Sequence, residues 1–168
     1  MLVRSALPHE RAAAAELRVR TYVDQGLVEP DSPYLPTLHA LGSDGTGEVL
    51  VAVDNGEVLG TATVLPYSPH SEVAWSESES ELRALAVSPQ AQGKGLGRRL
   101  LAAVFDQARR FDAQSIVLST RTNMTAAQQM YVAAGFVRLP ERDWSPRAGV
   151  RLLAYRLVLP RGTSNSQR

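Results

Sequence analysis

Cysteine is absent from the 168-residue chain, and this absence excludes two features. No disulfide framework can form, which is consistent with a reducing compartment. No cysteine can carry an acyl group either, so any group transfer must be direct or must use another nucleophile. The three histidines, His9, His39 and His70, are scattered, and they form no spacing typical of metal ligands. We therefore expect no metal site.

Long apolar runs and charge runs of one sign are also missing. No stretch of 18 apolar residues is present, so no segment is expected to span a membrane. The first residues are interrupted by Arg4, Glu10 and Arg11 and show no apolar core of a secretory signal, which makes the cytoplasm the expected location. The net charge of +1 argues against a nucleic-acid partner.

The composition instead fits a globular enzyme-sized domain. Hydrophobic residues make up 44% of the chain, which is typical of a folded protein with a substantial core. We expect a single domain over residues 1–160 and a disordered polar tail over residues 161–168.

Apolar periodicity predicts a mixed α/β fold. Strands are predicted over residues 2–6, 48–53, 58–65, 81–87, 114–120, 136–139 and 150–159, and helices over residues 8–25, 34–41, 96–111 and 125–134. Residues 66–80 should form a loop or an irregular extension of a hairpin, and residues 140–148 a loop. A strand, a crossover helix and a strand in succession imply one parallel pair, whereas the Asn55-Gly56 hairpin implies an antiparallel one. The expected sheet is mostly antiparallel, with helices on both faces.

A glycine-rich turn joins the strand at 81–87 to the amphipathic helix. It reads Gln92-Gly93-Lys94-Gly95-Leu96-Gly97-Arg98-Arg99. The first N–H groups of a helix lack intrahelical partners and carry partial positive charge, and glycine lets an anion approach the backbone closely. A phosphate or pyrophosphate ligand is predicted. The spacing fits neither a Walker loop nor a dinucleotide fingerprint, because no Ser or Thr follows Lys94 and the third glycine comes too early.

The turn instead resembles the Q/R-x-x-G-x-G/A signature of the GCN5-related N-acetyltransferase (GNAT) superfamily. The segment Leu85-Ala86-Val87-Ser88-Pro89 resembles the family's central strand, and residues 127–136 are similar to its A-x-x-x-Y-x-x-x-G-F helix. The resemblance implies a GNAT-like acyl-CoA acyltransferase fold, in which a bulge splays the central strand from its parallel neighbour. Acetyl-CoA would bind there as cosubstrate, through Leu85, Ala86, Val87, Gln92, Gly93, Lys94, Gly95, Leu96, Gly97, Arg98 and Asn123.

The resemblance also implies catalytic roles. Tyr131 would protonate the thiolate leaving group, because a phenol stays protonated near neutral pH. Glu81 on the central strand is the leading candidate for the general base, followed by Glu79, His70 or a water chain. Many relatives carry Asn where this chain has Met124; Asn123, one residue early, would contact pantetheine or only cap the helix.

The acceptor is expected to be a primary amine of an unidentified small molecule or peptide. Tyr22, Tyr34 and His39 are candidate contacts by the resemblance, and the glutamates at 72, 77, 79 and 81 could form an acidic rim that attracts a cationic amine. Alternatively, this segment is a solvated loop whose glutamates only keep it soluble. Alternative functions are a non-catalytic coenzyme A sensor and an acyltransferase with another acyl chain or a hydroxyl acceptor. The oligomeric state stays open, and a homodimer is possible.

Overall fold

A computed structural model describes residues 1–161 of the chain. The tail predicted over residues 161–168 lies outside the described residues, apart from Arg161.

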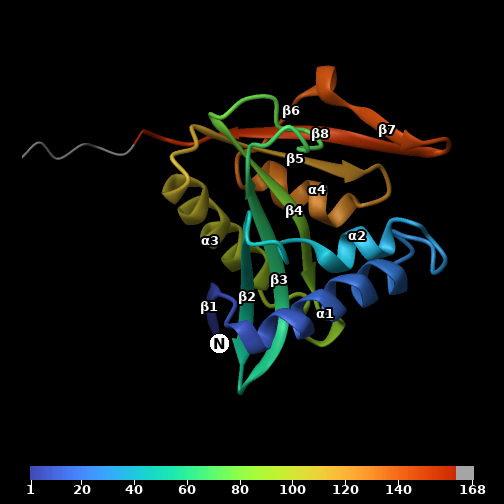
Figure 1. The fold of residues 1–168 in the computed structure, drawn as a ribbon, viewed down its shortest axis with the longest axis vertical. Coiled ribbons are helices and arrows are strands. Elements are labelled where there is room, and N and C mark those ends of the chain that lie inside the picture. The colour runs from blue at the N-terminus through green and yellow to red at the C-terminus, as the bar shows by residue number, and fades with distance from the viewer. Residues whose placement is uncertain (162–168) are drawn as a thin grey trace, which may run out of the picture.

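One twisted sheet organises the molecule (Figure 1). Its strands are β1 (Leu2–Ser5), β2 (Glu48–Asp54), β3 (Glu57–Pro66), β4 (Glu79–Val87), β5 (Ser115–Arg121), β6 (Val137–Arg138), β7 (Trp144–Arg147) and β8 (Val150–Val158). Their spatial order is β1-β2-β3-β4-β5-β8-β6, with β7 paired to β8. The β4–β5 pair is parallel and the other pairs are antiparallel, so the predicted mixed, mostly antiparallel sheet is confirmed.

Helices cover both faces of this sheet, as predicted (Figure 1). A 3₁₀ turn (Pro8–Glu10) leads into α1 (Arg11–Asp24), followed by α2 (Leu35–Ala40), α3 (Leu96–Arg110) and α4 (Thr125–Ala133), with two further 3₁₀ turns at Pro89–Ala91 and Pro140–Arg142. Among the helices of residues 1–161, none has the length and hydropathy that a membrane span requires.

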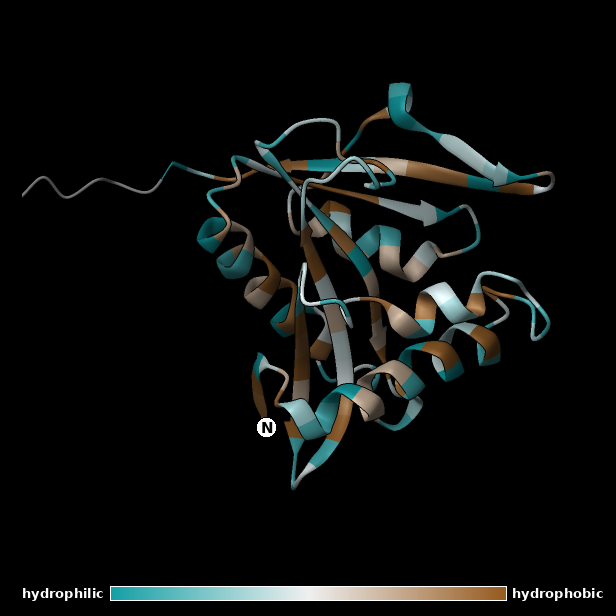
Figure 2. Ribbon diagram, in the orientation of Figure 1, coloured by the Kyte–Doolittle hydropathy of each residue, from teal (hydrophilic) through white to brown (hydrophobic). Residues whose placement is uncertain are grey.

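The alternation of side chains along β2 explains why both faces are covered. Val51 and Val53 pack with Ala14 of α1 on one face, and Leu50 packs with Leu100 of α3 on the other. Successive residues of a strand point to opposite faces, so an unbroken apolar strand needs cover on both. Figure 2 shows this strand as a hydrophobic band, with hydrophilic residues on the outward turns of α3.

A bulge interrupts β4 at Ala84. Thr61 and Thr63 of β3, two positions apart, pair with Ala86 and Arg83 of β4, three positions apart, so β4 carries one extra residue. Ala84 has a positive φ of 58°, a left-handed conformation that is unusual for a residue other than glycine. The bulge implied by the resemblance is thus confirmed.

The parallel pairing of β4 with β5 is correspondingly short. Only Glu79–Glu81 of β4 pair with Ser115–Val117 of β5. Beyond these residues the two strands are not paired, so the part of β4 that contains the bulge and the end of β5 border a gap in the sheet.

The structure corrects two local predictions. Residues 140–148 are not only loop, because β7 forms an edge strand there; Pro146 is tolerated since an edge strand need not donate from every residue. The backbone of Met124 occupies the cap position of α4 and no side chain caps this helix, so the capping role considered for Asn123 is wrong.

Helix α2 is anchored by the buried side chain of Arg18. Its guanidinium donates hydrogen bonds to the carbonyl oxygens of Leu38 (2.9 Å), His39 (3.3 Å) and Leu41 (3.4 Å), and to the hydroxyl of Thr63 (3.3 Å). Burial lowers the pKa of Arg18, yet arginine stays protonated in proteins, so the backbone dipoles of the α2 end offset its charge. This contact fixes α2 against α1 and β3.

The first helical turn is tied to β1 by an ion pair. Arg4 donates two hydrogen bonds to the carboxylate of Glu10, at 2.7 and 2.8 Å, and the N–H of Leu7 donates a third at 2.8 Å. These contacts, with Arg4 as the main cause, lower the pKa of Glu10 from 4.5 to about 2. A carboxyl whose pKa is lower in the folded state stabilises the fold above its unfolded pKa, and this contribution is lost as the pH falls through the folded pKa.

We therefore predict that Glu10→Gln will flatten the fall in the free energy of unfolding between pH 4.5 and about 2, relative to the unmodified protein. Urea unfolding at steps of pH measures this, and Glu16→Gln, at an exposed position of α1, is the matched control. An unchanged pH slope in the Glu10 variant would contradict the role of this pair.

Candidate active site

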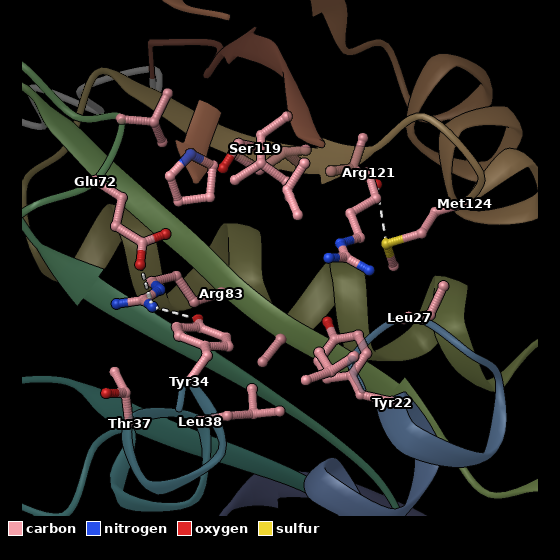
Figure 3. A pocket seen from close by; sticks show the side chains of 18 of the residues that line it. Tyr22, Leu27, Tyr34, Thr37, Leu38, Glu72, Arg83, Ser119, Arg121 and Met124 are labelled. Atoms are coloured by element: carbon pink, nitrogen blue, oxygen red, sulfur yellow. Dashed lines mark hydrogen bonds and ion pairs between the residues drawn. The ribbon is translucent and has the colours of Figure 1, made fainter. Parts of the chain in front are cut away.

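A cavity of about 430 Å³ lies where β4 and β5 separate. Its walls come from the α1–α2 region, from Arg83 and Ala84 of β4, from Ser119 and Arg121 of β5, from α4, and from the β7–β8 hairpin (Figure 3). A volume of about 300–1,000 Å³ is usual for small-molecule sites. The bulge and the shortened pairing therefore produce a site of suitable size at the gap in the sheet.

Tyr131 of α4 lies in the wall of this cavity and is buried. Its ring packs against Phe136 and Tyr155, with centroid distances of 5.6 and 6.5 Å. Burial raises the pKa of Tyr131 well above the ordinary value, so the hydroxyl keeps its proton at neutral pH. A proton donor is thus held at the position where the sequence expects one.

Glu81 also lines the cavity, but its carboxylate is already hydrogen-bonded. It accepts the backbone N–H groups of Val73 (2.5 Å), Ala74 (3.2 Å) and Glu72 (3.3 Å), and the residue is only 1% exposed. This buried carboxylate holds the loop before β4 against the strand.

Glu72, carried by that loop, forms a cluster with Arg83 and Tyr34. The Nη2 atom of Arg83 donates to Glu72 at 2.5 Å and to the hydroxyl of Tyr34 at 2.6 Å (Figure 3). The side chain of Glu72 is 24% exposed, and burial raises its pKa although Arg83 opposes this. The sequence did not single out Arg83 as a site residue. Its signal was its place two residues after Glu81, which puts both side chains on one face of β4.

The acidic rim predicted from four glutamates is not formed. Glu79 is buried, pairs with Arg142 at 2.8 Å and accepts the N–H of Trp75 at 2.8 Å. Of these four glutamates, only Glu77 is exposed and makes no ion pair with a described residue, since Arg83 neutralises the glutamate at position 72 and backbone amides bind the one at 81. The sequence could not show this because Arg142 lies 63 residues from its partner.

The glycine turn before α3 has the shape of an anion cradle. Gly93 and Gly95 have positive φ angles of 77° and 76°, and a Cβ added to either would meet no atom within 4 Å. Within residues 1–161, no acceptor is found for the N–H groups of residues 93–98. Lys94 and Arg98 are exposed beside them and form no ion pair with a described residue. These features fit a phosphate ligand.

Three residues of the predicted binding set also have structural contacts. Gln92 donates from its side chain to the carbonyl of Val87 at 3.1 Å, which closes the turn. Leu96 is buried in the main core. A Cβ at Gly97 would lie 2.8 Å from the sulfur of Met130, so a larger residue there would have to displace this flexible side chain of α4.

Asn123 is exposed and lies beside a second, shallower hollow rather than in the main cavity. Met124 lines the main cavity instead and accepts a contact from the hydroxyl of Thr120 at 3.3 Å. The side chain that enters the site at this point is therefore a thioether.

The candidate acceptor contacts divide into two groups. Tyr22 and Tyr34 both line the cavity, and burial raises the pKa of each phenol. His39 and His70 are exposed and do not line it. The structure therefore brings the two tyrosines into the site and leaves the two histidines outside.

Comparison with known proteins agrees with this geometry. Residues 12–136 match the model of the Acetyltransferase (GNAT) family. The chain is 31% identical to aminoglycoside N(6')-acetyltransferase type 1 of Stenotrophomonas maltophilia over 80% of this chain and 84% of that one. It is 30% identical to the L-methionine sulfoximine/L-methionine sulfone acetyltransferase of Salmonella typhimurium, over 61% and 56% of the two chains. It also matches a mycothiol acetyltransferase of Renibacterium salmoninarum at 30% identity, spanning only 27% of that protein.

Solved structures share the fold. The yncA protein of Salmonella typhimurium, solved with acetyl-CoA, superposes with a TM-score of 0.71 at 23% identity, covering 100% of this chain and 99% of the other. A GNAT acetyltransferase of Staphylococcus aureus Mu50 gives a TM-score of 0.72 at 17% identity, covering 95% and 99%.

We predict that Gly95→Leu will weaken coenzyme A binding at least tenfold, about 1.4 kcal/mol, because the side chain would enter the anion cradle. Calorimetric titration with coenzyme A measures this. Gly45→Leu is the matched control, since Gly45 has a φ of 77° and equally open surroundings but lies in a distant turn. Equal affinities of the two variants would show that the turn is not the phosphate site.

Proposed function

The chain belongs to the acetyltransferase (GNAT) family and is an acetyl-CoA-dependent N-acetyltransferase; we propose that it acetylates a small primary amine, by direct transfer in a ternary complex, in the cavity between β4 and β5. One observation carries the proposal: the protonated phenol of Tyr131 and the carboxylate of Glu72 line the same cavity, at the gap next to the bulge. Direct transfer is supported by the lack of cysteine.

The geometry of the turn and of the gap supports a set of residues that would hold acetyl-CoA. The free N–H groups of residues 93–98, with Lys94 and Arg98, would bind its phosphates. The backbone of Leu85, Ala86 and Val87 borders the gap and would pair with its pantetheine arm. Acetyl-CoA supplies the activated acyl group; the protein supplies position and proton transfer.

Two side chains would move the protons. Glu72 takes the first proton of the ammonium, directly or through water, so that the nitrogen lone pair can form the N–C bond. Tyr131 donates its proton to the sulfur as the C–S bond breaks. The nitrogen then loses its second proton, which restores the phenol of Tyr131, directly or through water. Glu81, the base expected from the sequence, has its oxygens on loop amides, so we assign it to positioning Glu72.

Further parts of the proposal concern the surroundings of the reaction. We propose that transfer needs no metal ion and takes place in the cytoplasm, without nucleic acid or a membrane. The part that concerns metal is supported by the absence, among residues 1–161, of any group of three or more His, Asp or Glu side chains that could hold a metal ion. The part that concerns nucleic acid is supported by the net charge of +1. A homodimer would be compatible with the cavity, which one chain lines by itself.

The direct test is a screen of an amine library that follows thiol release from acetyl-CoA. Turnover of at least one amine separates the enzyme from its rival, a coenzyme A sensor without activity. Replacing the acetyl donor by propionyl-CoA, and amines by matching alcohols, tests the rival acyltransferases. Coenzyme A binding without turnover of any acceptor would contradict the proposal.

We predict that Tyr131→Phe will lower kcat about 10²-fold or more, with little change in the affinity for coenzyme A, because the ring stays and the donor is lost. Steady-state kinetics and calorimetry measure the two quantities. Tyr155→Phe is the control, since Tyr155 packs against Tyr131 but does not line the cavity. Full turnover of the Tyr131 variant would leave that residue a packing role only.

The two carboxylates can be told apart by stability. We predict that Glu72→Gln will lower kcat about 10²-fold with a smaller fall in Tm than Glu81→Gln, because an amide oxygen can still accept the hydrogen bond of Arg83. Glu81→Gln will lower both quantities, since its amide would face backbone N–H donors. Glu77→Gln, at an exposed position, is the control. If Glu81→Gln keeps its Tm and loses more activity than Glu72→Gln, Glu81 is the base.

A further inference from the structure

The last residue of β5, Arg121, turns its guanidinium into the cavity. Figure 3 shows it on the side opposite Glu72 and Arg83. Among residues 1–161, no carboxylate lies within 4.0 Å of this guanidinium, and no hydrogen bond of its side chain is formed.

Other partly buried arginines differ in this respect, except Arg156, which makes no ion pair with a described residue but does not line the cavity. Arg83, Arg138 and Arg142 each contact a carboxylate, at 2.5, 2.6 and 2.8 Å. A guanidinium has five donors in a planar fork that suits a carboxylate, and leaving them unmatched in a cavity is unfavourable. Arg121 is therefore a cation in the site for which the described chain supplies no counterion.

A second arginine adds to this charge. Arg147, at the end of β7, lines the same cavity and also makes no ion pair with a described residue. Together with Arg121 it borders the shallower hollow next to the cavity. The described residues that line this hollow include three arginines, Arg121, Arg147 and Arg151, against one carboxylate, Glu29, so the β5 and β7 side of the site carries an excess of positive charge.

The remainder of the wall is mainly apolar. It includes Leu27, Val28, Leu38, Leu118, Val150 and Leu152. A ligand that matches all these surfaces has an amine for Glu72, an anionic group for the arginine side, and an apolar body between or beside them.

Building on the proposed function, we propose that the acceptor is a small amino acid-like zwitterion: a primary amine that also carries a carboxylate, with an apolar side chain. Arg121 binds the carboxylate and Arg147 reinforces the positive potential from the β7–β8 hairpin. Arg121 is then a specificity-determining residue of the acceptor site, and amines without an anionic group lose this contact.

The test uses matched triplets of acceptors with the full chain and saturating acetyl-CoA. Each triplet contains an amino acid, its carboxamide and its decarboxylated amine, for example L-leucine, L-leucinamide and 3-methylbutylamine, with several apolar side chains represented. We expect kcat/KM for the best amino acid to exceed that of its two neutral-ended analogues at least tenfold, the size of one charge-assisted hydrogen-bond pair.

Variants then assign the effect to the guanidinium. Arg121→Gln should raise KM for the amino acid at least tenfold and leave kcat/KM of the two analogues and KM for acetyl-CoA unchanged. The preference for the amino acid is then abolished, and Arg121→Lys should restore part of this preference. Arg20→Gln is the control, since it removes the same charge from an exposed position on α1 outside both hollows. Unchanged circular dichroism and Tm show that each variant is folded.

The outcomes separate the two proposals. If no amine of any kind releases thiol, the proposed function itself fails. If amines are acetylated but the carboxylate brings no preference, only the zwitterion proposal is overturned. It is also overturned if Arg121→Gln raises KM for acetyl-CoA in place of KM for the acceptor, because the guanidinium then serves the coenzyme's phosphates.

Discussion

The left-handed conformation of Ala84 is the constraint on which the site depends. For a residue with a Cβ, this conformation costs about 1–2 kcal/mol, and it persists because β3 pairs with β4 on both sides of the bulge. The extra residue turns the end of β4 away from β5, so their pairing stops after Glu81. Without this local strain the two strands would pair further, and the cavity that Tyr131 lines would close.

Compensation of buried charge organises the walls around this gap. Glu81 binds the amides of the loop that carries Glu72, and Arg18 binds the carbonyls at the end of α2. An unpaired buried charge is far more costly than a paired one, so these contacts hold the loop before β4 and helix α2 in fixed positions. Against this background Arg121 and Arg147 line the cavity without a counterion from the described chain, and this absence is the basis of the proposed ligand carboxylate.

The glycine turn shows how one motif serves packing and binding together. Gly93 and Gly95 provide the left-handed backbone that leaves N–H groups free, whereas Gly97 provides the close approach of α3 to α4. Helix packing thus fixes the direction of the N–H groups that an anion would meet. The cradle and the core therefore depend on the same few residues.

The sequence by itself determined the features that depend on neighbouring residues. Apolar periodicity predicted the main strands and helices, the order of strand, helix and strand predicted the parallel pair, and the motif around Gly95 and Tyr131 predicted the family. Only the tertiary structure decided the partners of the charged residues. Three of the four predicted rim glutamates are bound by arginines or by backbone N–H groups. The structure also adds an edge strand at β7 and places Asn123 outside the cavity that Met124 enters. The physical reason is that ion pairs and cavity walls join residues far apart in the chain, such as Glu79 with Arg142. Local sequence patterns do not indicate which of these distant residues meet.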